Sequence, residues 1–101
     1  MADAVKVATL SEVPEGTAKA VDVRGTPIAL YNVGGTVYAT TNTCPHRGGP
    51  LGEGDLEGSV VTCPWHRFRY DVATGACLTN AALTIGCYTV RVQGQDVLVE
   101  V

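Results

Sequence analysis

The 101-residue chain lacks several features that mark large classes of protein. No apolar run approaches the roughly 20 residues that a membrane-spanning helix needs. The net charge is −3, whereas nucleic-acid-binding domains usually carry a basic surface. The first six residues also lack the basic and apolar regions of a secretory signal peptide. We therefore expect a soluble cytoplasmic protein that binds neither membranes nor nucleic acids.

Long helices are also not expected, because 12 glycines and five prolines are spread along the chain. The apolar residues instead alternate with polar ones over short runs, which is typical of half-buried strands. We expect strands around 5–7, 21–23, 28–31, 37–39, 59–62, 88–92 and 96–101. Gly34-Gly35 predicts a tight hairpin turn, and Leu10–Val13 leaves room for one helical turn. The prediction is an all-β antiparallel β-sandwich, with residues 1–101 forming a single domain.

Two segments interrupt the strand pattern. Residues 42–58 are rich in glycine and are predicted to be a long loop with little secondary structure. A second loop begins at Cys63-Pro64. Long irregular segments inside a small domain usually serve a function.

These two loops contain both histidines of the chain, each close to a cysteine. The motifs are Cys44-Pro45-His46 and Cys63-Pro64-Trp65-His66. One such pair could be a buried thiol packed beside an imidazole ring. Two pairs that use every histidine favour a metal centre with two thiolate and two imidazole ligands. Zinc and an iron–sulfur cluster both accept this ligand set. Because each loop mixes the two ligand types, the spacing favours a two-iron cluster over a zinc finger.

The two motifs resemble the paired boxes of the Rieske family. The first box continues from Cys44 and His46 to Gly48 and Leu51, and the second continues to Tyr70-Asp71 and Thr74-Gly75. The chain is most similar to the small Rieske-type ferredoxins of bacterial ring-hydroxylating dioxygenases. This resemblance implies one [2Fe–2S] cluster per chain, held by Cys44, His46, Cys63 and His66 at the ends of two loops on a β-sandwich.

The chain departs from the respiratory members of that family near the cluster. Those proteins have a cysteine in each loop that forms a disulfide, where this chain has Gly49 and Trp65. They also have a serine where this chain has Phe68. Fewer hydrogen bonds to the cluster imply a lower reduction potential. Tyr70 is expected to be a core aromatic residue, and Arg67-Phe68 occupies a place where many relatives have a glycine.

The remaining features near the loops have simple interpretations. Cys77 and Cys87 are expected to be free, packed thiols. Trp65 is expected to shield the cluster, with contact to a partner as the alternative. Arg47, Arg67 and Arg69 lie in the loops, whereas Glu53, Asp55 and Glu57 lie between them. The basic residues predict that a partner docks there with an acidic patch.

These observations favour an electron-transfer protein over an enzyme. A mononuclear iron site would need further histidines, and Gly52-Glu53-Gly54 is only a fragment of a dinucleotide-binding motif. We expect a monomeric one-electron carrier between a flavin-dependent reductase and a terminal oxygenase. The alternatives are a small subunit of a larger oxidoreductase, such as a nitrite reductase-like complex, and a zinc-stabilised binding module.

Overall fold

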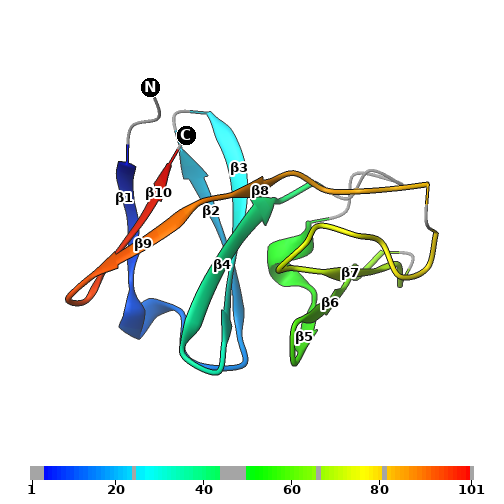
Figure 1. Cartoon of the computed structure of the whole chain (residues 1–101), viewed down its shortest axis with the longest axis horizontal. Helices are drawn as coiled ribbons and strands as arrows, with labels where there is room; N and C mark the ends of the chain where they lie inside the picture. The colour runs from blue at the N-terminus through cyan, green and yellow to red at the C-terminus, as the bar shows by residue number, and fades with distance from the viewer. Residues whose placement is uncertain (1–3, 24, 44–49, 66, 81, 101) are drawn as a thin grey trace.

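Short β-strands build almost the whole fold of the computed structural model (Figure 1). The structure describes residues 4–23, 25–43, 50–65, 67–80 and 82–100. The ten strands are β1 (Ala4–Thr9), β2 (Ala18–Val23), β3 (Thr26–Val33), β4 (Thr36–Thr41), β5 (Asp55–Glu57), β6 (Val60–Thr62), β7 (Arg69–Asp71), β8 (Cys87–Tyr88), β9 (Val90–Gln93) and β10 (Asp96–Glu100). Two single-turn 3₁₀ helices, η1 (Leu10–Glu12) and η2 (Leu51–Glu53), complete the described elements. The predicted all-β class is confirmed.

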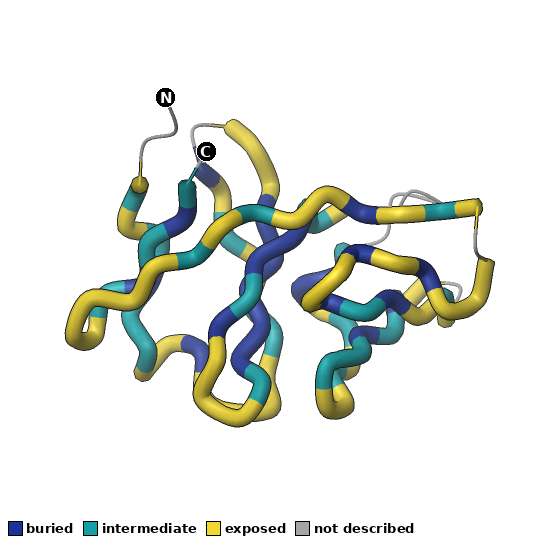
Figure 2. Tube along the Cα trace, in the orientation of Figure 1, coloured by how far each residue is buried: buried dark blue, intermediate teal, exposed yellow. Residues whose placement is uncertain are grey.

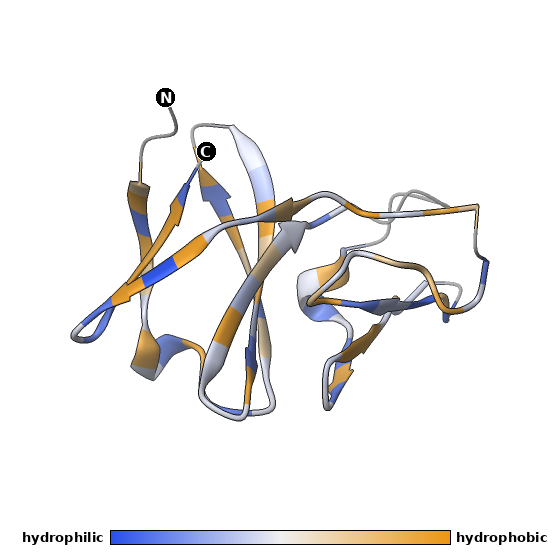
Figure 3. Cartoon of the chain, in the orientation of Figure 1, coloured by the Kyte–Doolittle hydropathy of each residue, from blue (hydrophilic) through white to orange (hydrophobic). Residues whose placement is uncertain are grey.

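The strands form three antiparallel sheets. The first has the order β1-β10-β9, the second β2-β3-β4-β8 and the third β5-β6-β7. The third sheet lies beside the other two (Figure 1), and its strands β6 and β7 flank the second predicted loop. Figure 3 shows polar and apolar residues alternating along several strands, as expected for sheets with one buried face.

Two hydrophobic cores lie on opposite faces of β3. Ile28 and Leu30 point into the first core, and Ala29 and Tyr31 point into the second. The first, which we call the sandwich core, comprises Ala8, Val13, Val23, Ile28, Leu30, Val37, Ala39, Val97 and Val99. The second, the loop-side core, comprises Ala29, Tyr31, Leu51, Val61, Cys63, Tyr70, Val72, Cys77 and Ile85. β3 is therefore buried on both faces and joins the sandwich to the third sheet (Figure 2).

Two local predictions are confirmed by the backbone. Gly34 and Gly35 have φ angles of +58° and +94° and form the turn between β3 and β4. This conformation suits a two-residue hairpin and is easily adopted by glycine. The helical turn expected at Leu10–Val13 is present as η1.

Two other local predictions are wrong in detail. The run 88–92 is not one strand, because β8 pairs with β4 whereas β9 pairs with β10. The chain passes from one sheet to another at Thr89, and the alternation of residues continues across the change. The segment 42–58 is not wholly irregular, because it contains η2 and β5. β5 has only three residues, too few for a pattern in the sequence to reveal.

Gly54 allows a close backbone approach at the start of the third sheet. A Cβ atom at this position would overlap the carbonyl oxygen of Thr62. We expect Gly54→Ala to lower the free energy of unfolding by about 2 kcal/mol, measured by urea denaturation. Gly86→Ala is the matched control, because Gly86 also has no positive φ angle and its Cβ would meet nothing within 4 Å. Equal stability of the two variants would contradict this packing.

Candidate metal centre

Cys63 is the one predicted cluster ligand that lies within the described residues. It follows β6 directly and is 1% exposed, as part of the loop-side core. Cys44, His46 and His66 lie outside the described residues. Cys63 therefore marks the inner end of the second loop.

The second loop is a short hairpin that is closed at its base by two backbone hydrogen bonds. The N–H of Cys63 donates to the carbonyl oxygen of Phe68 at 2.7 Å. The N–H of Arg67 donates to the carbonyl oxygen of Cys63 at 3.0 Å. Arg67 closes this hairpin with a φ angle of +59°, in the left-handed region. The path after position 66 is thus a tight turn of the kind that glycine usually provides.

The ends of the first loop are held together by Asn42. The N–H of Leu51 donates to the backbone carbonyl of Asn42 at 2.8 Å, and the N–H of Gly52 donates to Oδ1 of Asn42 at 2.7 Å. An isolated β-bridge between Thr43 and Pro50 lies between these bonds and residues 44–49. This role of Asn42 is not apparent from the sequence, because a single loop asparagine has no distinguishing pattern.

The bases of both loops end in the same hydrophobic core. Leu51, at the end of the first loop, is fully buried in the loop-side core together with Cys63. Tyr70 is also fully buried there, which confirms its expected role as a core aromatic residue. The packing of this core therefore fixes the described ends of the two loops relative to each other.

Residues 77–79 pack beside β7, the strand that follows the second loop. Tyr70 forms an isolated bridge with Cys77. The N–H of Leu78 donates to the carbonyl oxygen of Arg69 at 2.7 Å, and the N–H of Arg69 donates to Oγ1 of Thr79 at 3.0 Å. These bonds tie residues 77–79 to β7.

Apolar and basic side chains are exposed at this end of the molecule. Trp65 is 59% exposed and Leu78 is 51% exposed. Arg67 and Arg69 are exposed as well. Among the described residues, none of the ion pairs involves either arginine. This surface can contact another molecule through both apolar area and positive charge.

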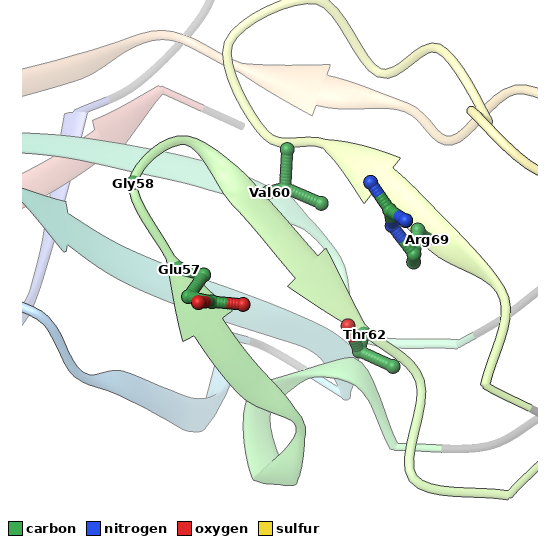
Figure 4. Close-up of a pocket in the computed structure, with 5 residues that line it drawn as sticks. All are labelled: Glu57, Gly58, Val60, Thr62 and Arg69. Atoms are coloured by element: carbon green, nitrogen blue, oxygen red, sulfur yellow. The ribbon is translucent and has the colours of Figure 1, made fainter.

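An open hollow lies on the outer face of the third sheet (Figure 4). Its lining residues are Glu57, Gly58, Val60, Thr62 and Arg69. Thr62 pairs with Arg69, and Val60 pairs with Glu57, so the hollow crosses all three strands. It contains none of the predicted cluster ligands.

The two leftover cysteines differ in burial. Cys77 is 6% exposed, and its Sγ accepts the N–H of Asn80 at 3.2 Å, as expected for a free packed thiol. Cys87 is also free but is exposed, so the expectation that it is packed is wrong. Its Sγ nevertheless lies 4.0 Å from the carbonyl oxygens of Val72 and Ile85. Partial burial of this sulfur, and secondarily the Asp71 carboxylate, raise the pKa of the Cys87 thiol.

Because the pKa of Cys87 is raised, its thiolate fraction at any given pH is smaller than that of an ordinary cysteine. We therefore expect alkylation of the protein by iodoacetamide at Cys87 to begin only at a higher pH than alkylation of a cysteine in a short peptide. Mass spectrometry of the labelled site across the pH range measures this shift. Cys87→Ser is the control that identifies the signal, and a rate equal to the peptide's would refute the effect of the environment.

The described surroundings of the site suit an iron–sulfur cluster. Cys63 is a thiol at the boundary between an apolar core and an exposed loop, where a cluster is partly shielded from water. The two loops together offer two thiols and two imidazoles, the ligand set of an unsymmetrical two-iron centre. Among the described residues, no group of three or more Cys, His, Asp or Glu side chains is placed to hold a metal ion elsewhere.

Comparison with known proteins agrees with the fold and the motifs. The family model of the Rieske [2Fe–2S] domain matches residues 3–98, and the chain belongs to this family. The ferredoxin component of the naphthalene 1,2-dioxygenase system of Pseudomonas aeruginosa is 39% identical over 97 residues, covering 95% of this chain and 93% of the relative.

Solved structures show the same likeness. A chain in the complex of reduced oxygenase and oxidized ferredoxin in carbazole 1,9a-dioxygenase matches with a TM-score of 0.89 and 35% identity, covering 96% of this chain and 92% of that one. A putative NADH-dependent nitrite reductase small subunit from Mycobacterium tuberculosis has a TM-score of 0.91 but only 20% identity, over 100% of this chain and 96% of that one. The second match shows a shared fold alone.

The protein is therefore a Rieske-type electron-transfer protein with a [2Fe–2S] cluster, and it is not itself a catalytic enzyme. Its similarity to ferredoxin components favours the carrier interpretation over the nitrite reductase alternative. No helix among the described residues is long and apolar enough to cross a membrane.

Proposed function

We propose that Cys44, His46, Cys63 and His66 are the four ligands of the cluster, within a single domain that spans residues 1–101. The match to the Rieske family and the burial of Cys63 at the base of the second loop support this assignment. The shared core beneath Leu51 and Cys63 supports the pairing of the two loops around one centre.

Serine substitution can distinguish the proposed ligand Cys63 from Cys77, a buried cysteine that is not a proposed ligand. We expect Cys63→Ser to lose the visible absorption of the cluster together with its iron and acid-labile sulfide, because an alcohol is a poor ligand for iron. Cys77→Ser should keep all three, although Cys77 belongs to the same core and is nearly as buried. Iron and sulfide assays on anaerobically purified protein measure the outcome.

The assignment fails if the two serine variants behave alike. It also fails if the wild-type protein is colourless and contains zinc, because the chain would then be a zinc-stabilised module.

We further propose that the protein carries electrons from a flavin-dependent reductase to a terminal oxygenase of a ring-hydroxylating dioxygenase system. The observation that carries this proposal is the 39% identity, over nearly the whole chain, to a ferredoxin component of such a system. The structural match to a chain from an oxygenase–ferredoxin complex supports the oxygenase as one partner. We propose that the carrier is a cytoplasmic monomer.

When bound, the cluster accepts and releases one electron. Residues of the chain influence this electron transfer through the reorganisation energy, the contact with the partner and the reduction potential. The hydrogen bonds at the base of the second loop and those made by Asn42 hold the described ends of both loops in place, which favours a small reorganisation on electron transfer. The exposed side chains of Trp65 and Leu78 provide apolar area on the same end of the molecule for contact with a partner. Phe68 provides no hydroxyl group near the cluster, in keeping with a potential below that of the respiratory proteins.

Reconstitution tests the carrier function directly. Purified reductase and oxygenase of a naphthalene dioxygenase system serve as partners, with NADH as the electron source and naphthalene as the substrate. We expect oxygenated product to form only when the holo-protein is added, and bleaching of the cluster by the reductase to consume one electron per chain. The Cys63→Ser variant is the control without a cluster. Failure of both half-reactions with cluster-loaded protein would contradict a role in dioxygenase systems.

A further inference from the structure

Arg67 has a backbone conformation that side chains rarely adopt. Its φ angle of +59° is the only positive value at a non-glycine residue in the described chain. The other seven described positions with positive φ are all glycines, namely Gly16, Gly25, Gly34, Gly35, Gly58, Gly75 and Gly94. A left-handed conformation destabilises a residue with a Cβ atom, whereas glycine adopts it readily. The stability of the fold therefore favours glycine at position 67.

Contacts among the described residues do not explain why position 67 has an arginine and not a glycine. The hydrogen bond from the Arg67 N–H to Cys63 involves only the backbone and would form equally with glycine. The side chain is exposed, and none of the ion pairs among the described residues includes it. Among the described residues, no ion pair therefore accounts for the guanidinium group at this position.

The surroundings of Arg67 indicate what that molecule offers. Arg69 is exposed two residues further along the same chain segment, and Trp65 precedes Arg67 by two residues with 59% of its surface exposed. Two basic side chains are therefore exposed in this short segment, although the whole chain has a net charge of −3. The acidic residues Asp55 and Glu57 lie on β5, which β6 separates from β7. Glu57 lines the same hollow as Arg69, but Arg67 does not line it.

We propose that Arg67 is a recognition residue for an acidic surface on the redox partner, retained at the expense of backbone strain. The proposal rests on the electron-carrier function and adds the charge of the partner's docking surface to it. It predicts opposite effects of one substitution, because Arg67→Gly relieves the strain and removes the recognising charge.

Two small oxidants of opposite charge test the local field without a natural partner. Ferricyanide stands for an anionic surface, and hexaamminecobalt(III) for a cationic one. In each reaction the reduced protein loses one electron and the metal complex gains it. Stopped-flow absorbance of the cluster, recorded between low and high ionic strength, gives the rate constants.

For the wild-type protein, we expect the ferricyanide rate to fall as salt is added, despite the net negative charge of the chain. Arg67→Gly should lower this rate roughly threefold at low ionic strength and should raise the hexaamminecobalt rate by a similar factor. A change in reduction potential would move both rates in the same direction. The two oxidants therefore separate a lost charge from an altered cluster.

Stability measurements supply the second half of the test. Arg67→Gly should raise the equilibrium constant for folding about fivefold, measured by urea denaturation of the holo-protein. Arg67→Lys keeps the charge and the Cβ atom, so it should restore both oxidant rates without the gain in stability. Arg91→Gln removes an exposed charge on β9, in the first sheet, and should leave both rates unchanged.

The proposal is wrong if the ferricyanide rate rises with salt, or if Arg67→Gly and Arg91→Gln have equal effects on the two rates. It is also wrong if Arg67→Gly lowers stability, because the left-handed turn would then not be strained. Absence of any cluster absorbance that bleaches on reduction would instead overturn the carrier function on which the proposal rests.

Discussion

The burial of Leu51 and Cys63 in one apolar core is the interaction on which the rest of the structure depends. These residues end the first predicted ligand loop and begin the second, and both are inaccessible to solvent. Each loop is glycine-rich or short and would have many conformations if it were isolated. Because the two bases pack against the same side chains, movement of one loop requires repacking of the core beneath the other.

The two faces of β3 connect this loop-side core to the sandwich. Ala29 and Tyr31 belong to the loop-side core. Ile28 and Leu30, on the other face of the strand, belong to the sandwich core. The hydroxyl group of Tyr31 is buried at 3.0 Å from Oγ1 of Thr40, and burial raises the pKa of this phenol. A phenol is already neutral at physiological pH, and the raised pKa of Tyr31 keeps it neutral at more alkaline pH as well. The third sheet thus packs against the apolar face of β3 that contains Ala29 and Tyr31.

The sequence was sufficient to predict the class of fold and the position of the loops, because both leave periodic or chemical patterns. Gly34-Gly35, which forms the turn between β3 and β4, is an example of such a local pattern. It was insufficient where pairing depends on contacts between distant residues. The change of sheet at Thr89 does not interrupt the alternation, and the three residues of β5 are too few to form a pattern. The clamp at Asn42 depends on a neighbour ten residues away, and the exposure of Cys87 depends on the sheet edge where it lies.

The sequence predicts four cluster ligands, of which only Cys63 lies within the described residues, so the assignment stays a proposal. The sequence already marked Arg67 as a basic loop residue in a place where many relatives have a glycine, but it did not show the backbone conformation there. A list of charges contains no information about φ angles, and the left-handed turn follows from the hydrogen bonds between Cys63 and the residues that close the hairpin. Once that turn is known, the identity of residue 67 becomes informative, because backbone geometry and side-chain chemistry favour different amino acids there. An exposed cation in a position suited to glycine therefore supports the proposed contact with a partner protein.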